Sequence, residues 1–318
     1  MSRGELNRED FFYGNKVISR LCGIWLKRDG SLLQQTLCWL YIFLFFGTAA
    51  CFFICELIIL GETFNEIQKF ISHIGLLLTH VVGILKCLVL VCQRNRIQNI
   101  MGKLQDENYR YSSVDTFQPS LLLKRGKRIS IVFSILIFIL YTFVGVSAHI
   151  SSQITINSVV KSGHHQNATC YNFMPYYFFI PFTSNTESQC GYALFFMDIS
   201  MDIFAWIIAC HDGIFAGLLN CLMIQFLIVG RALRTIRKRC LKQLDMHEEY
   251  CILHDEFKPE LEKNMYGELN RCIKHLNILL QVRNDIENSF TYVTLAQTIA
   301  TLFVLASCLY VSSSVSIL

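Results

Sequence analysis

Three side chains with the chemistry of zinc ligands lie close together late in the chain. His247, Cys251 and His254 are spaced at i, i+4 and i+7, so one face of a helix would carry all three. A structural zinc site uses four ligands, whereas the surrounding HEEYCILHDEF offers only these three imidazole and thiolate groups. HEEYC also lacks the second histidine of a metalloprotease motif. The sequence therefore predicts no metal site.

A second group with acid–base chemistry is His211 beside Asp212, inside a long apolar run. Because a carboxylate at mid-depth in a bilayer costs about 2.5–3.5 kcal/mol, we expect Asp212 to face protein, with His211 or Lys86 as its partner. For the same reason we expect Asp198 near the outer water. The sequence contains no nucleophile elbow, phosphate loop or paired-carboxylate motif. We predict that the protein is not an enzyme and uses no cofactor. The alternative is a membrane-embedded, lipid-modifying enzyme that uses His211 and Asp212.

Thr142, Gly145 and His149 follow one another at i, i+3 and i+7 in another apolar run and would share one helix face. A small residue between two polar side chains is typical of a mostly apolar ligand pocket with few polar groups. The same pattern also occurs where two membrane helices pack closely, because a small residue lets their backbones approach. Both interpretations stay open at this point.

Apolar helices must position these groups, because 53% of the 318 residues are hydrophobic and only 16% are charged. A soluble domain has about 25% charged residues. The composition and the apolar runs predict an all-α membrane protein, a helical bundle with five transmembrane helices. The expected transmembrane helices are 36–60, 67–92, 129–150, 191–230 with an extension, and 288–312. The connecting segments are 1–35, 61–66, 93–128, 151–190 and 231–287.

Lys and Arg are distributed very unevenly among the connecting segments. Residues 1–35, 93–128 and 231–287 hold 6, 8 and 11 of them, 25 together, whereas 61–66 and 151–190 hold none and one. Basic residues accumulate on the cytosolic side of a membrane. We therefore expect a cytosolic N-terminus, cytosolic loops at 93–128 and 231–287, an outer turn at 61–66 and an extracellular loop at 151–190.

The expected extracellular loop carries two further signals. Asn167-Ala168-Thr169 is a glycosylation acceptor triplet, and its position agrees with the orientation given by the charges. Of 14 cysteines, only Cys170 and Cys190 fall in this loop, where the compartment is oxidising. We predict a disulfide between them and a glycan on Asn167.

Aromatic side chains are concentrated at the end of the same loop. Such a cluster is typical of the aromatic belt at lipid headgroups, and it would also serve as a lid over a ligand cavity. The two interpretations are compatible. The residues are Phe173, Tyr176, Tyr177, Phe178, Phe179 and Phe182.

Two long stretches resemble the insect odorant receptor family. The first is PYYFFIPF at 175–182 followed by DIFAWIIACHDGIFAGLLNCLMIQFLIVGRAL at 202–233, and the second is ELNRCIKHLNILLQVRNDIENSFTYVTLAQTIATLFVLASCLY at 268–310. Cys272, Ile273 and His275 correspond to a Cys-Ile and a His on the family's helix before its fifth span, and Glu287 to a Glu just before that span. The cytosolic N-terminus expected from the charges also agrees with the family's inverted topology.

The resemblance implies a receptor subunit for small volatile odorants in olfaction. With a shared co-receptor, in a hetero-oligomer expected to be tetrameric, it would act as a ligand-gated cation channel. The chain would lie in the plasma membrane of an olfactory sensory neuron dendrite and bind no nucleic acid. Family members have seven spans, so the resemblance implies that the last two are lacking here. The co-receptor's long cytosolic insertion is also missing, which favours a tuning receptor. A gustatory-type receptor relative is an alternative.

In this family the odorant lies among the outer halves of the spans, which extends the ligand-binding prediction to facing residues of the second and fourth spans. The predicted ligand-binding set is Phe70, His73, Ile74, Thr142, Gly145, His149 and Met201.

An apolar stripe follows the cytosolic helix that leads into the fifth span. A stripe of this kind must pack against another helix. The resemblance implies a cytosolic anchor where subunits meet, and packing within one chain is the alternative. The predicted anchor residues are Leu269, Ile273, Leu276 and Leu280.

Overall fold

The structure is a computed structural model of the chain, and it describes residues 10–26, 31–64, 66–161, 174, 176, 178–182, 187–246 and 259–315. Within these residues the regular structure is helical, apart from one isolated bridge between Val114 and Phe117. The helices are α1 (Tyr13–Leu21), α2 (Leu32–Thr63), α3 (Ile67–Cys92), α4 (Arg94–Leu104), the 3-10 turn η1 (Glu107–Tyr109), α5 (Pro119–Lys161), α6 (Glu187–Arg234), α7 (Ile236–Gln243) and α8 (Pro259–Val315).

Five of the described helices, α2, α3, α5, α6 and α8, are long and apolar enough to cross a bilayer. The all-α fold class predicted from the sequence is confirmed. Several helices extend well beyond the apolar runs that predict them. α5 begins at Pro119 and α8 at Pro259, since proline fits the first position of a helix, where its missing N–H group has no partner to lose. The polar stretch before the fifth apolar run, expected to be cytosolic, and that run itself form one continuous helix, α8.

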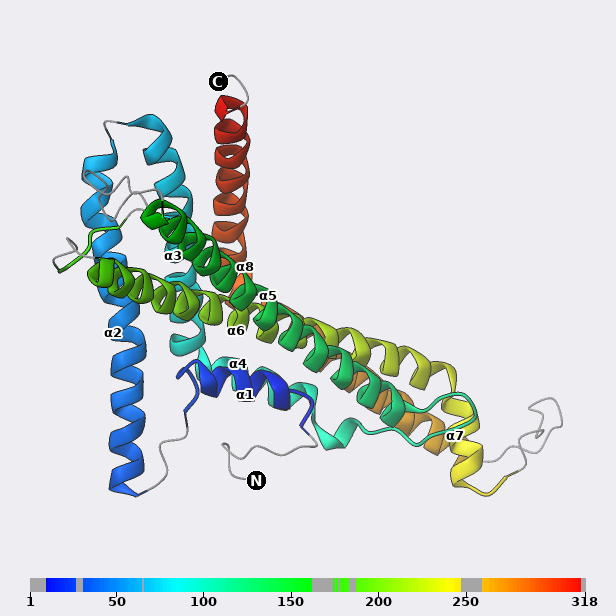
Figure 1. Cartoon of the computed structure of the whole chain (residues 1–318). Helices are drawn as coiled ribbons and strands as arrows, with labels where there is room; N and C mark the ends of the chain where they lie inside the picture. The colour runs from blue at the N-terminus through cyan, green and yellow to red at the C-terminus, as the bar shows by residue number, and fades with distance from the viewer. Residues whose placement is uncertain are drawn as a thin grey trace.

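α6 is the central helix of the bundle. In its most apolar window 56% of the residues are buried, against 11% in the corresponding windows of α5 and α8. α6 packs against α5 along much of its length and also contacts α3, α8 and α2 (Figure 1). α5 and α8 therefore turn most of their apolar side chains outward, as helices that face lipid do.

The short amphipathic helix α1 docks against α5 and α6 through one buried amide. The side-chain amide of Asn15 donates to the Ser134 hydroxyl at 2.9 Å and to the Gly213 carbonyl at 2.7 Å. Its side-chain oxygen accepts from the Ser130 hydroxyl at 3.4 Å. Gly217, one turn after Gly213, keeps this contact open, because a Cβ there would come within 3.1 Å of the Asn15 side-chain oxygen.

On the side of the bundle where α7 lies, one aromatic ring joins α7 to α8. The guanidinium groups of Arg239 and Arg271 lie over the Tyr111 ring, 5.0 and 5.1 Å from its centre. Arg239 is 1% exposed and pairs with the Glu268 carboxylate, while the Tyr111 hydroxyl lies 3.2 Å from Nδ1 of His275. Burial raises the pKa of the Tyr111 hydroxyl, so the ring stays neutral between its two cations.

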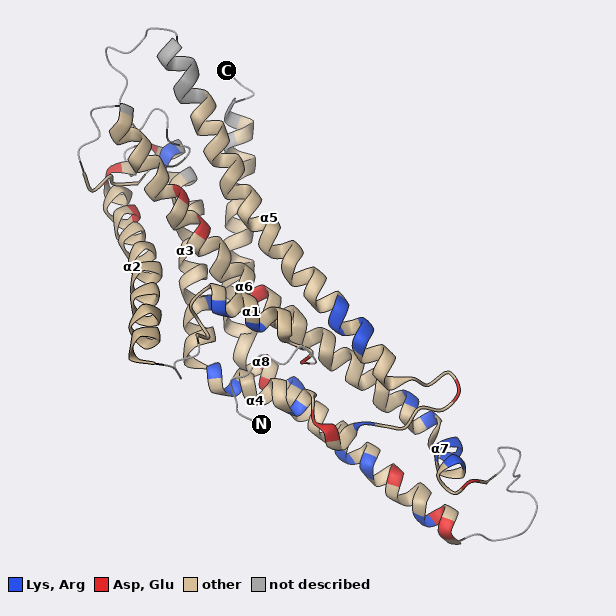
Figure 2. Ribbon diagram, turned by 60° about the horizontal axis from the view of Figure 1, so that its bottom comes forward, with Lys and Arg blue, Asp and Glu red and all other residues tan. Residues whose placement is uncertain are grey.

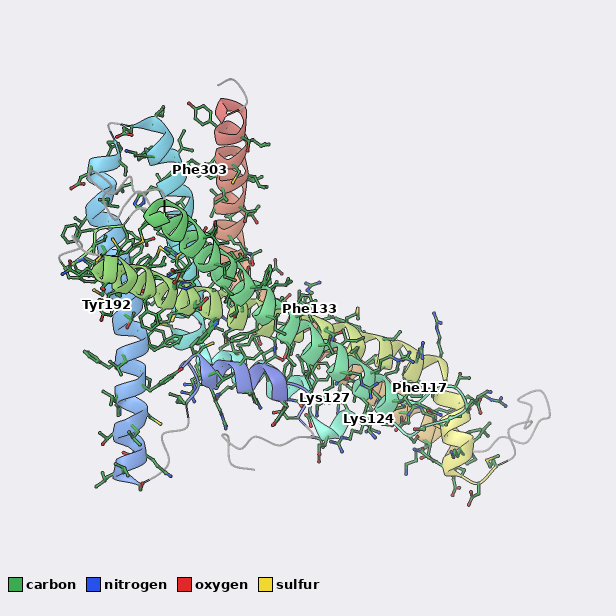
Figure 3. The ribbon with its side chains drawn as sticks, viewed as in Figure 1. Phe117, Lys124, Lys127, Phe133, Tyr192 and Phe303 are labelled. Atoms are coloured by element: carbon green, nitrogen blue, oxygen red, sulfur yellow. The ribbon has the colours of Figure 1, made fainter. Side chains whose placement is uncertain are left out.

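Lys and Arg side chains gather at this side of the bundle. In Figure 2 they are concentrated on α1, α4 and α7 and on the parts of α5 and α8 near α7, while the rest of the long helices is almost free of them. Lys124 and Lys127 lie in the part of α5 that begins near α7 (Figure 3). The side that these basic residues define is called the basic side below.

Candidate functional site

The three predicted ligand residues of α5 all face α6, where they form a short antiparallel series of contacts. Nε1 of Trp206 donates to the Thr142 hydroxyl at 3.0 Å. A Cβ at Gly145 would collide with the carboxylate of Asp202, and Nδ1 of His149 pairs with the carboxylate of Asp198. The sequence did not identify these partners on α6, because their pairing depends on the register between two helices.

These contacts correspond to the helix-packing interpretation of the α5 pattern. Gly145 gives room to a side chain of the neighbouring helix, which occupies the space that a ligand would need. One acceptor in this contact is unsatisfied: Oδ1 of Asp202 is buried without a hydrogen-bond partner among the described residues.

The predicted residues of α3 lie in a different part of the bundle. His73 is fully buried, and its Nε2 lies 3.0 Å from the backbone carbonyl of Glu56 on α2. The ring of Tyr176 stacks on the His73 ring at 5.2 Å. Nδ1 of His73 is buried and has no hydrogen-bond partner in the described part of the chain. Phe70 and Ile74 are half-buried neighbours on the same helix.

A buried histidine–carboxylate contact lies about two helical turns further along α3. Nδ1 of His80 is 2.7 Å from one carboxylate oxygen of Glu56, and both side chains are almost fully buried. The His80 ring also packs against Phe204 of α6, at 4.4 Å between ring centres. The carboxylate of Glu56 and its backbone carbonyl thus hold two histidines of α3 in fixed orientations.

The segment that precedes α6 covers this part of the bundle. Every second residue from 174 to 180 is buried. These residues, Met174, Tyr176, Phe178 and Ile180, are at most 8% exposed. Phe178 lies 5.2 Å from Phe52 between ring centres, which seals the segment against α2. The rings at 179 and 182 are about 40% exposed (Phe179 38%, Phe182 40%). The segment therefore combines an inward-facing aromatic cover with outward-facing aromatic side chains.

The structure does not bring the two predicted groups together, because α6 lies between them. α6 turns Phe204 toward α3, where it contacts the position of Gly83. Asp202 and Trp206, each two residues away, face α5. Two residues correspond to about 200° around a helix, so α3 and α5 contact opposite faces of α6. Met201 is half-buried and packs against the core.

The carboxylate of Asp212 on α6 has two partners, as the cost of burying a charge demands. Nζ of Lys86 lies 2.6 Å from Oδ1 of Asp212, and Nδ1 of His211 lies 3.1 Å from the same oxygen. The prediction that Asp212 faces protein, beside His211 or Lys86, is confirmed, and both partners are present. Nε2 of His211 is buried and has no partner among the described residues.

Two cavities stand out in the described part of the protein. The larger, of about 450 Å³, lies over α6 between α5 and α8 and is lined by His211 and Asp212. The smaller, of about 310 Å³, lies near α7 and is lined by Thr116, Phe117 and three residues at the end of α6 and just after it.

The predicted anchor stripe lies on the part of α8 that precedes its apolar run. Leu269, Ile273 and Leu280 are 39%, 46% and 39% exposed, and Leu276 is half-buried. The neighbouring face of the helix is buried, with Cys272 and Leu279 fully covered. The stripe is therefore open on one side of a helix that the rest of the chain holds in place.

Several predictions fall on residues outside those described. They concern the glycosylation site Asn167, the thiol Cys170 and the three candidate zinc ligands at 247, 251 and 254. Cys190, at the start of α6, is disulfide-bonded. Its pairing with Cys170 stays a prediction.

Comparison with known proteins gives a family and a fold. The family model described as 7tm Odorant receptor matches residues 66–317. A search of curated protein sequences finds no significant match. Among solved structures, the insect olfactory receptor OR5 from Machilis hrabei matches with a TM-score of 0.63 at 10% identity, over 93% of this chain and 69% of that one. The same receptor in complex with eugenol matches with a TM-score of 0.48 at 11% identity, over 90% and 68%. At such identities the likeness shows the fold alone.

Proposed function

The chain belongs to the odorant receptor family, and we propose that it binds a small volatile odorant between α2, α3 and α6, in the half of the membrane away from the basic side. The observation that carries this proposal is the match of the family model to residues 66–317. It places the chain among membrane receptors rather than enzymes, so the lipid-modifying alternative is set aside. Five helices with the length and composition of spans support a multi-pass membrane protein.

The site that best suits an odorant surrounds His73. A ligand pocket of this type is mostly apolar and holds a few polar groups that fix orientation. Here Tyr176 stacks on the histidine, and the rings of Phe52 and Phe178 pack close by. Phe70 and Ile74 on α3 and Met201 on α6 complete the proposed contacts.

The hydrogen-bonding capacity of His73 sets the ligand chemistry. If Nε2 carries the proton and donates to the Glu56 carbonyl, Nδ1 of the neutral ring is an acceptor. That atom is buried and unpartnered among the described residues, and such an atom costs about 1–3 kcal/mol. A ligand hydroxyl would satisfy it. We infer a preference for volatile alcohols and phenols over esters of the same size.

The residues of α5 take a different place in the proposal. Thr142, Gly145 and His149 hold α5 against α6 and do not face His73. We assign them to helix packing, through which a ligand on the α3 side of α6 could bias the position of α5.

The finer steps follow from the family. We propose that the chain assembles with a co-receptor through the exposed stripe Leu269, Ile273 and Leu280, in the plasma membrane of a sensory neuron. Odorant binding then favours the open state of a cation channel by its higher affinity for that state. The exposure of an apolar stripe on a cytosolic helix supports this assembly.

The experiment is a binding measurement on the purified chain in lipid nanodiscs. A panel of volatile alcohols, phenols and esters is tested for stabilisation against thermal unfolding, since a ligand of the folded state raises the unfolding temperature. We expect His73→Phe to weaken alcohol and phenol binding about 3- to 10-fold, the value of one hydrogen bond, and to leave esters unchanged. His149→Phe, on the other side of α6, is the matched control. If no volatile stabilises the native chain, the proposal fails. If His73→Phe binds phenols as tightly as the native chain, the site is wrongly placed.

A further inference from the structure

A second candidate site is separate from the His73 region and lies over α6 between α5 and α8. These two helices each pack against α6 but make little contact with each other, so a space of about 450 Å³ remains between them. In Figure 3, Phe133 marks the α5 side of this space in the middle of the molecule, and Phe303, which follows the lining residue Leu302, lies on the upper part of α8. Its lining residues are Phe133 and Ile137 from α5, His211, Asp212, Phe215 and Ala216 from α6, and Thr294, Gln297, Thr298, Thr301 and Leu302 from α8.

The cavity lies toward the basic side of the bundle. His211 and Asp212 directly precede Gly213, whose carbonyl receives the α1 amide of Asn15. The α8 residues that line the cavity begin at Thr294, four positions after Phe290. The Phe290 ring packs against His211 at 5.2 Å between ring centres. The cavity therefore differs in depth and in helix pair from the proposed odorant site, which is built on α2 and α3.

One buried polar atom in the cavity wall has no hydrogen-bond partner in the described part of the chain. His211 is 2% exposed, and its Nε2 is buried without a hydrogen-bond partner among the described residues. Its Nδ1 lies 3.1 Å from Asp212, which Lys86 already neutralises at 2.6 Å. In the neutral ring Nδ1–H donates to the carboxylate, so Nε2 is left as an acceptor aimed at a donor from outside the cluster.

The α8 wall has the same bias toward acceptors. The hydroxyls of Thr294 and Thr298 donate to backbone carbonyls of their own helix at 2.9 Å, so each oxygen keeps only acceptor capacity for a ligand. Gln297 adds an amide between them. The opposite wall is apolar, with Phe133, Ile137 and Phe215. An occupant that donates a hydrogen bond toward His211 and presents apolar surface to Phe133, Ile137 and Phe215 suits these walls.

We propose that this cavity is a second ligand site, which takes a small neutral molecule with a hydroxyl group on an apolar body, an alcohol or phenol, whose hydroxyl donates to Nε2 of His211. A cationic amine is disfavoured, because Asp212 is already neutralised by Lys86 and a second buried charge would have no counter-ion. The volume lies in the range of small-molecule pockets.

The test is photolabelling of the full chain in phosphatidylcholine nanodiscs. The probe is an eight-carbon alcohol carrying a diazirine, and its methyl ether serves as the control that cannot donate. Mass spectrometry locates the label. We expect the alcohol to label peptides that contain 211–216 or 294–302, and excess 1-octanol to compete. The methyl ether should label these peptides about 3- to 10-fold less, the value of one hydrogen bond.

Variants connect the label to the proposed contact. His211→Phe should reduce alcohol labelling to the level of the ether, while His211→Gln, which keeps a side-chain acceptor, should restore part of it. Ala216→Phe fills the cavity and should remove labelling by both probes. Gln297→Leu provides a wall variant that leaves the Lys86–Asp212 pair intact, and it should reduce alcohol labelling. Thermal unfolding checks that each variant is folded.

The outcomes separate this site from the odorant site. Equal labelling by alcohol and ether would mean that lipid chains or any apolar molecule fill the cavity, and it would overturn the proposal. The same conclusion follows if a folded His211→Phe variant labels like the native chain. Because labelling at 211–216 is read independently of odorant binding at His73, either site can fail while the other stands.

Discussion

Lys86 and Asp212 show how single residues inside the membrane depend on their partners. Lys86 is fully buried on α3, and its ammonium lies 2.6 Å from the carboxylate of Asp212 on α6. Removing Lys86 leaves Asp212 charged and mostly buried with the His211 ring as its remaining partner in the described part of the chain, which costs more than losing the attraction itself.

We therefore predict that Lys86→Met destabilises the folded chain by about 3–5 kcal/mol, whereas the double variant Lys86→Met/Asp212→Leu loses much less. Thermal or denaturant unfolding in detergent micelles measures both. Lys69→Met is the matched control, because Lys69 is 42% exposed and pairs with the exposed Glu66 at the start of α3. A double variant as unstable as the single one would show that the pair contributes through packing and not through charge.

The contacts of a residue can be predicted from the sequence when its own chemistry demands a particular partner. They cannot be predicted when they depend on the register between two helices. The partner of Asp212 was predictable, because a buried carboxylate needs a counter-charge and Lys86 lies well inside a neighbouring span, whereas Lys69 lies near the beginning of that span. The pairing of Gly145 with Asp202 was not, because it depends on how far α5 slides along α6. The orphaned ring nitrogens of His73 and His211 likewise appear only once the surrounding atoms are placed.

Among the elements, the long apolar helices were predictable and the small docking helix was not. An amphipathic pattern at the N-terminus is visible in the sequence, but its partner is a groove made by Gly213 and Gly217 of α6 with Ser130 and Ser134 of α5. The signal that could have found it is the small residue pair at i and i+4 in α6, opposite a polar Asn15. The continuity of α8 does not follow from the sequence either, because the change from polar to apolar composition within it looks like a boundary between two elements.

The exposed stripe of α8 supports a prediction at the scale of the element. Ile273→Lys and Leu280→Lys place a charge on positions that are 46% and 39% exposed. Because these side chains face outward, we expect the free chain to keep its stability within about 0.5 kcal/mol. Co-purification with an odorant receptor co-receptor should fall about 5- to 30-fold, since desolvating a charge at an apolar interface costs about 1–2 kcal/mol or more.

Gln281→Lys, on an exposed position of the same helix outside the stripe, is the matched control and should leave co-purification unchanged. If the stripe variants still co-purify at the native level, the interface lies elsewhere. If instead the free chain loses stability, the stripe packs within one chain, which is the alternative that the sequence left open.

At the scale of the whole molecule, composition determines the class and contacts determine the arrangement. The all-helical membrane class follows from 53% hydrophobic and 16% charged residues, because so few charges cannot solvate a surface of this size. That α6 is the centre, with α3 and α5 on opposite faces, does not follow from composition. It depends on which faces carry small residues such as Gly83 and Gly145, and many apolar faces compete for each contact.

The orientation of the whole chain gives the last prediction, and it depends on charge alone. Figure 2 shows Lys and Arg gathered on α1, α4, α7 and the adjoining parts of α5 and α8. In the sequence, the segments assigned to this side hold 25 Lys and Arg, while those on the other side hold one. Each basic residue in a short loop resists transfer across the membrane, so the basic side should remain in the cytosol.

An epitope tag ahead of Ser2 should therefore be invisible to antibody on intact cells and appear after permeabilisation, while a tag beside Asn167 should be stained without permeabilisation.

The glycan predicted on Asn167 gives an independent readout, because glycosylation takes place only on the outer side of the membrane. Asn167→Gln should increase mobility on a gel to the same extent as enzymatic deglycosylation. Charge reversal of the KRGKR cluster at 124–128 should weaken this preference, since the bias would lose four of its 25 basic residues. Staining of the tag ahead of Ser2 on intact cells would mean that the charge bias does not set the orientation, and the proposed odorant site would then face the cytosol.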